Sequence, residues 1–212
     1  MAVYDLEEQE QIAEIKAWWK QYGGLVILVL SVAAITVGAV RGWSYYQNKQ
    51  GMEAGELYAQ LQGAVGAKEP KKVQDIATVI EKTYARSGYA AFAALAAGKA
   101  AFESGDFAAA KVHLQWVVDN GRDSETRDIA RLRLGIVLLD EKKYDEALKV
   151  ADAPHADTLT ALYADLKGDV LVAQGKPQDA RAAYQLALDK GDAKSNYRAL
   201  VQAKLDALGA AR

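Results

Sequence analysis

Hydrophobic and polar positions divide the chain into two parts with different patterns. Twenty residues without a charge stand between Lys20 and Arg41. After residue 48, apolar residues recur at helical spacing in Ala-rich runs that are separated by short polar turns. The pattern predicts one continuous apolar helix followed by an all-α domain.

The apolar run has the length of a membrane-spanning helix. A hydrocarbon core about 30 Å thick requires about 20 apolar helical residues. Aromatic residues flank the run on both sides, where their rings favour the interface between membrane and water. They are Trp18, Trp19 and Tyr22 around its start, and Trp43, Tyr45 and Tyr46 after its end. These flanks favour a membrane span over the core helix of a soluble protein, and we predict a transmembrane helix over residues 21–43.

The arm before the span, residues 1–20, argues against a cleaved signal peptide. It holds five acids against Lys16 and Lys20, whereas a signal peptide begins with a short basic region, and no convincing cleavage motif precedes Arg41. Apolar residues recur in the arm at helical spacing beside the acids, which predicts an amphipathic helix. Two roles are open for this helix, an anchor at the membrane interface or a docking element for a partner.

The distribution of basic residues does not predict the orientation of the span. Two stand on each side, Lys16 and Lys20 before it and Arg41 and Lys49 after it. The spacing Gly38-x-x-x-Gly42 would let two spans pack closely. Arg41 places half of this pattern outside the apolar core, so a homo-oligomer is not established.

The domain contains an internal repeat. Three stretches align at a glycine, with intervals of 37 and 33 residues: "GKAAFESGDFAAAKVHLQWV" from Gly98, "GIVLLDEKKYDEALKVADAP" from Gly135 and "GDVLVAQGKPQDARAAYQLA" from Gly168. Twelve residues after each glycine stands an alanine, at Ala110, Ala147 and Ala180. Small residues at both places let two antiparallel helices approach closely, while Phe107 and Tyr144 fill the turn. The repeat resembles the tetratricopeptide repeat, whose period is about 34 residues.

The repeats are degenerate, since Ala94, Arg131 and Ala164 replace the usual tryptophan and Pro177 replaces the third turn aromatic. Upstream, Ala77 lies 33 residues before Ala110 and extends the period. We predict one short α-solenoid over residues 48–212, with a degenerate pair at 52–86, repeats at about 91–120, 128–153 and 161–190, and a capping helix at 195–208.

Composition argues against catalysis and nucleic-acid binding. Residues 42–212 carry 23 basic and 23 acidic side chains, so the surplus of positive charge that a phosphate backbone requires is missing. The chain has no cysteine, and its two histidines, His113 and His155, lack a metal-ligand spacing. No phosphate-binding loop or nucleophile motif is present. We predict a protein that is not an enzyme, with no catalytic residues, no cofactor and no metal site.

The order of these parts resembles the YfgM family over essentially the full chain. The resemblance rests on the acidic arm with "QIAEIKAWWKQYG", one uncleaved span, "GWSYYQ" and a degenerate repeat domain of about 165 residues. It implies an ancillary subunit of the SecYEG translocon in the bacterial inner membrane, with a cytoplasmic N-terminus and a periplasmic C-terminal domain. It also implies association with the membrane-anchored chaperone PpiD and handover of secreted proteins. An adaptor of another cell-envelope assembly complex is the alternative, because repeat folds do not name their ligand.

The likeness to tetratricopeptide superhelices implies a binding face on the first helix of each repeat. The face would use the second, fifth, ninth and twelfth repeat positions, with the glycine as the eighth. These positions hold Phe92, Leu95, Lys99 and Phe102, then Ile129, Leu132, Ile136 and Leu139, then Leu162, Asp165, Asp169 and Val172. The expected face is mainly apolar with acids at one end, and its side chains either bind a partner or fill the core of so short a solenoid.

Overall fold

The computed structural model of the chain describes residues 2–193 and 195–210. Within these ranges every regular element is a helix and no strand occurs, which confirms the predicted all-α class. The chain divides into two compact units, Met1–Gln50 and Gly51–Arg212. The helices are α1 (Ala2–Gly66), α2 (Pro70–Thr83), α3 (Tyr89–Glu103), α4 (Phe107–Asn120), α5 (Ser124–Asp140), α6 (Tyr144–Ala151), the short 3-10 helix η1 (Asp157–Leu159), α7 (Thr160–Ala173), α8 (Pro177–Lys190) and α9 (Asn196–Ala210).

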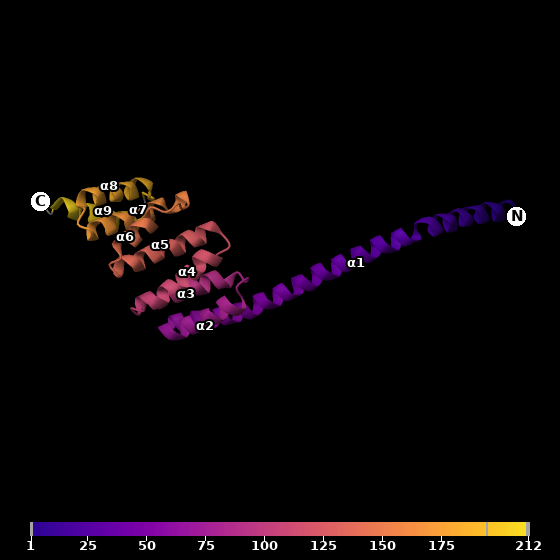
Figure 1. The fold of residues 1–212 in the computed structure, drawn as a ribbon, viewed down its shortest axis with the longest axis horizontal. Coiled ribbons are helices and arrows are strands. Elements are labelled where there is room, and N and C mark those ends of the chain that lie inside the picture. Colours follow the sequence, from indigo (N-terminus) through magenta and orange to yellow (C-terminus); the bar gives the residue numbers. More distant parts are fainter. Residues whose placement is uncertain (1, 194, 211–212) are drawn as a thin grey trace. The chain divides into compact units, whose positions relative to one another are not determined.

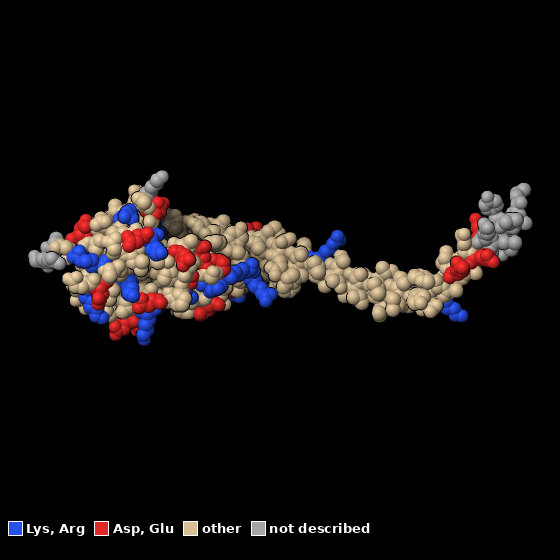
Figure 2. All heavy atoms as spheres, turned by 90° about the horizontal axis from the view of Figure 1, so that it is seen from above, with Lys and Arg blue, Asp and Glu red and all other residues tan. Residues whose placement is uncertain are grey.

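The first unit is the N-terminal part of α1. By length and composition this helix can cross a membrane, and no other helix among the described residues can. Its apolar side chains are exposed, with Leu25 at 63%, Leu28 at 64% and Ile35 at 72%. A core helix of a soluble protein would bury such residues. Figure 2 shows the run as a tan length of helix with charged residues on both sides of it.

The second unit is a series of helical hairpins, which Figure 1 shows running back and forth along the chain. The end of α1 pairs with α2 through a cluster that contains Leu61, Val73 and Ile80. The following hairpins are α3 with α4, α5 with α6, and α7 with α8. Val201 of α9 is buried in the cluster of the last hairpin, so α9 closes that end of the core.

Three of the turns within hairpins repeat one backbone geometry. Gly105, Lys142 and Gly175 each stand seven residues after a repeat glycine, and their φ angles are 82°, 61° and 73°. In each turn the next residue donates its N–H to a carbonyl five residues earlier, as Asp106 does to Ala101. A left-handed residue with this hydrogen bond ends an α-helix and reverses the chain. The sequence repeat is therefore a repeat of turn geometry.

The small residues of the repeat lie where paired helices touch, as predicted. Ala110, Ala147 and Ala180 are all 0% exposed. A Cβ added to Gly98 would lie 2.9 Å from Leu114 of the paired helix α4, and one added to Gly135 would lie 2.9 Å from Val150 of the paired helix α6. No side chain larger than hydrogen fits these approaches without movement.

The first hairpin departs from the predicted alignment. α2 begins 37 residues before α4, because the left-handed turn residue Lys68 stands 37 residues before Gly105. This interval aligns Val73, not Ala77, with Ala110. Both side chains are buried, so burial alone does not reveal the shift of one helical turn.

Candidate binding surface

The first helices of the hairpins leave one stripe of residues at the surface. On α5 the stripe consists of Glu125, Ile129, Arg133, Ile136 and Asp140, which are exposed or half-buried and follow one another at intervals of three or four residues. Residues at this spacing share one face of a helix. The corresponding stripe of α3 contains Tyr89, Phe92, Ala96, Lys99 and Glu103. We call the two stripes together the α3–α5 face.

The structure places the predicted face residues at three levels of burial. The exposed ones are Phe92, Lys99, Ile136 and Val172. The half-buried ones are Phe102, Ile129, Leu139, Leu162 and Asp169. The buried ones are Leu95, Leu132 and Asp165.

The three buried residues share one place in the repeat, three positions before the glycine. Leu95 is 9% exposed, Leu132 7% and Asp165 6%. Leu95 belongs to the cluster between α3, α4 and α5, and Leu132 to the cluster between α5, α6 and α7. These two leucines hold neighbouring hairpins together, which is the core-filling role, one of the two left open for the face.

The predicted acidic end of the face is covered by α9. Lys204 Nζ lies 2.8 Å from Asp165 Oδ1 and 2.7 Å from Asp169 Oδ2. The hydroxyl of Tyr197 donates to Asp165, and that of Tyr184 donates to Asp169 over 2.8 Å. Burial, together with these bonds to carboxylates, raises the pKa of both tyrosines. The acids are therefore paired within the domain and do not form an open acidic surface.

The open part of the surface lies on α3 and α5. Tyr89 is 40% exposed, Phe92 55% and Ile136 39%. A hollow of about 400 Å³ that is open to solvent lies between Ala96, Lys99 and Glu103 on one side and the turn between α1 and α2 on the other. Apolar side chains of this size at a surface are typical of protein-binding sites.

Arg133 belongs to the α3–α5 face, but it occupies none of the four repeat positions from which the face was predicted. It stands two residues before Gly135, and its guanidinium Nη1 lies 3.4 Å from the Leu95 carbonyl oxygen of α3. The corresponding residues of the other repeats, Ala96 and Leu166, are apolar. The signal was a charge inside the otherwise apolar run "LRLGIVLL".

The two histidines have structural partners. His113 Nδ1 lies 2.7 Å from Glu81 Oε1, and both side chains are buried between α4 and α2. His155 stacks on Tyr163 with 4.0 Å between ring centroids, and its Nδ1 donates to the Ala153 carbonyl. Across the part of the chain that the structure describes, no group of three potential ligands is placed to hold a metal ion.

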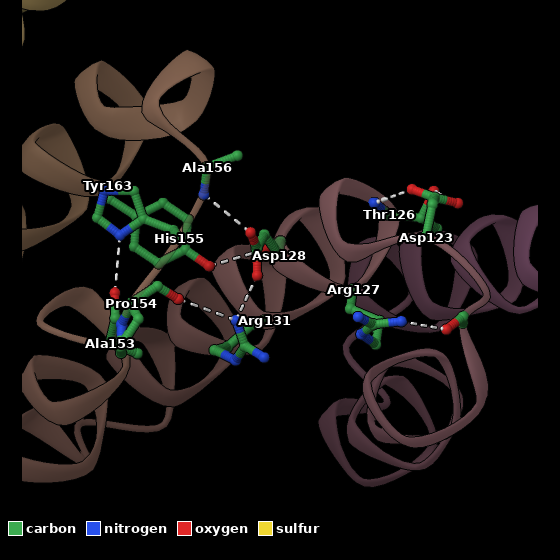
Figure 3. Close-up of polar contacts among 11 residues, drawn as sticks. Asp123, Thr126, Arg127, Asp128, Arg131, Ala153, Pro154, His155, Ala156 and Tyr163 are labelled. Carbon is green, nitrogen blue, oxygen red and sulfur yellow. Dashed lines mark hydrogen bonds and ion pairs between the residues drawn. The ribbon is translucent and has the colours of Figure 1, made fainter.

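Polar contacts fix the loop between α6 and α7, as Figure 3 shows. One carboxylate oxygen of Asp128 accepts from the Ala156 N–H at 2.9 Å, and the other accepts from Arg131 at 2.5 Å. Tyr163 donates its hydroxyl proton to the Asp128 carbonyl at 2.8 Å. The partners in these contacts all belong to the domain, so we assign the cluster to packing of the loop.

Comparison with known proteins identifies relatives of nearly equal length. A family model described as a tetratricopeptide repeat-like domain matches residues 16–210. A protein of Neisseria gonorrhoeae is 36% identical over 207 residues, which cover 96% of this chain and 98% of the relative. A protein of Haemophilus influenzae is 30% identical over 191 residues, covering 89% and 92%.

A third relative, from Escherichia coli, is 28% identical over 211 residues, which cover 98% of this chain and 99% of the relative. All three relatives carry the name ancillary SecYEG translocon subunit. No solved structure gives a significant match. The chain therefore belongs to the tetratricopeptide repeat-like family of ancillary SecYEG translocon subunits.

Proposed function

We propose that this chain is a membrane-anchored, non-enzymatic interaction module that serves as an ancillary subunit of the SecYEG translocon. The observation that carries the proposal is similarity over nearly the whole chain to relatives with that name. One exposed apolar helix supplies the anchor, and the repeat domain supplies a surface for partners.

The proposed orientation places residues 1–20 in the cytoplasm and the repeat domain in the periplasm. A long domain crosses the membrane largely irrespective of its charges, so its neutral composition is compatible with this side. A reporter that works only outside the cytoplasm should be active when fused after Arg212. The same reporter fused before residue 15 should be inactive. Activity in the N-terminal fusion alone would reverse the proposed orientation.

The proposed periplasmic partner is a membrane-anchored chaperone of the PpiD type, to which the domain would help to hand over secreted proteins. The support is the exposed apolar part of the α3–α5 face, where Phe92 and Ile136 lie. A few residues contribute most of the binding energy in typical protein interfaces, and aromatic residues and arginine are enriched in those interfaces. Because these side chains are exposed, they can be changed without opening the core.

The test uses the full chain, tagged and extracted in mild detergent. Phe92→Ser combined with Ile136→Ser should reduce capture of the chaperone while leaving the thermal midpoint near that of the wild type. The matched control is Val112→Ser with Leu186→Ser, which removes exposed apolar side chains from α4 and α8. Unchanged capture by the folded face variant would move the interface elsewhere. Capture of another envelope complex without SecYEG would favour the alternative adaptor role.

A further inference from the structure

Arg133 lies at the centre of the α3–α5 face. It shares the exposed stripe of α5 with Ile129 and Ile136, one turn away on either side. Its side chain is half-buried and reaches toward α3, where the Leu95 carbonyl is a distant hydrogen-bond acceptor at 3.4 Å. The guanidinium has five N–H donors, so one such contact leaves most of them without a protein acceptor.

The charge of Arg133 is not balanced within the domain. Among the side chains that the structure describes, no carboxylate forms an ion pair with it. Burial without a compensating partner lowers its pKa. A partly desolvated charge without a counterion destabilises the folded state, so the position calls for an explanation beyond packing.

Another pair of helices in the same domain shows how such a cation is balanced. Lys204 of α9 reaches back to the residue three before a repeat glycine, which is Asp165 of α7. Arg133 of α5 also reaches back to the residue three before a glycine, but in α3 this residue is Leu95. The carboxylate that pairs with the cation of α9 has no counterpart at α3.

We propose that Arg133 binds an Asp or Glu side chain in a segment of a partner protein, with apolar residues of the same segment packed on Phe92 and Ile136. A planar guanidinium pairs with a carboxylate through two parallel hydrogen bonds. The charge balance of the domain does not provide the basic surplus that a phosphate backbone requires. The inference rests on the proposed binding role of the face and names the chemistry of its ligand.

The experiment starts from a library of random dodecapeptides displayed with blocked C-termini. It is selected against the full chain in detergent and, in parallel, against Arg133→Met. The wild type should enrich peptides that carry Asp or Glu beside large apolar residues. Arg133→Met should lose the acidic preference and keep the apolar one. Arg86→Met is the matched control, since Arg86 is exposed in the loop between α2 and α3.

An enriched peptide and its Glu→Gln or Asp→Asn counterpart then complete a double-mutant cycle with both protein forms. The loss of the carboxylate should weaken binding to the wild type about tenfold or more, and should have little effect on binding to Arg133→Met. The thermal midpoint of Arg133→Met should equal or exceed that of the wild type, because an unbalanced charge is removed. If the midpoint falls, the cycle is repeated with Arg133→Gln, because glutamine removes the charge and keeps an N–H donor for the Leu95 carbonyl.

Three results would overturn the proposal. They are a wild-type selection without acidic enrichment, an acidic preference that survives in both Arg133 variants, and a preference seen only with free peptide C-termini. The last would assign the site to a terminal carboxylate. The cycle uses purified protein and peptide alone, so its outcome is independent of whether SecYEG and the chaperone co-purify.

Discussion

At the scale of single residues, the closest approach between paired helices is set by Gly168. A Cβ at this position would lie 2.3 Å from the ring of Tyr184, well inside contact distance. The ring cannot turn away freely, because its hydroxyl donates to Asp169 over 2.8 Å and its side chain is 3% exposed. One hydrogen atom in place of a methyl group therefore decides how closely α7 and α8 pack.

Replacing Gly168 by alanine should destabilise the domain. The added methyl group forces α7 and α8 apart, and we expect a loss of about 1–3 kcal/mol in the free energy of unfolding. Chemical denaturation of the full chain in detergent, followed by circular dichroism, measures this loss. The control is Gly63→Ala on the exposed side of α1, where nothing lies within 4 Å of the added Cβ. That change should stabilise by up to about 1 kcal/mol, since alanine favours helix. Equal effects of the two substitutions would contradict the packing described here.

At the scale of elements, α9 shows what the sequence could and could not predict. The sequence predicts a capping helix at 195–208, and a helix occurs there with Val201 buried against the last hairpin. Its neighbour Leu200, also apolar, is 53% exposed. The contact of Lys204 with Asp165 joins residues 39 positions apart, and no local pattern indicates it. Repeat spacing identified the positions along each helix, but burial at these positions depends on which neighbouring helix covers them.

The contacts of α9 should fail at alkaline pH. The pKa of Lys204 is raised, although burial opposes its charge, because bonds to Asp165 and Asp169 favour it. The pKa values of Tyr184 and Tyr197 are raised by burial and by bonds to the same acids. In all three cases the folded state holds its proton more tightly than the unfolded state, so this stability is present below about pH 10 and is lost as the pH rises further.

The measurement is the thermal midpoint between pH 8 and pH 12, with tyrosinate absorbance recorded in parallel. The midpoint should fall above about pH 10. Tyr197→Phe should show a smaller alkaline decrease, because one of the shifted protons is then absent. A wild-type midpoint that stays level to pH 12 would show that the polar contacts of α9 contribute little.

At the scale of the whole molecule, the chain combines two kinds of surface. The span exposes apolar side chains along its length, whereas the domain has a buried apolar core between its hairpins and nearly equal numbers of basic and acidic side chains. The apolar surface of the helix can be covered by lipid, and the charged surface of the domain can be hydrated by water. The length of the apolar run predicts a span, because the thickness of the hydrocarbon core sets how many apolar residues a crossing helix needs. The structure shows one long helix there that can cross a membrane by length and composition.

Charges placed within the span should release the protein from the membrane. Leu28→Arg with Ile35→Arg puts two cations seven residues apart on one exposed face of α1. Each arginine near the middle of a span costs about 2.5–3.5 kcal/mol on the insertion scale. Extraction of membranes with alkaline carbonate should then recover much of the variant in the soluble fraction. Leu28→Ala with Ile35→Ala should stay in the pellet, and equal partitioning of the two variants would argue against a lipid-embedded helix.

The pairing of Lys204 with Asp165 also limits how the solenoid can change its length. If the hairpin of α7 and α8 were deleted, α9 would follow α6, and Lys204 would meet Leu132, the residue three before Gly135. The ammonium group would then have no counterion, because leucine carries no charge. The shortened chain would lose the ion pair that attaches α9 to the last hairpin. A duplicated hairpin inserted before α9 would be closed in the same way only if it carried an acid at this position. The terminal helix is thus matched to one hairpin, and gain or loss of repeats in this family would require the lysine and the acid to change together.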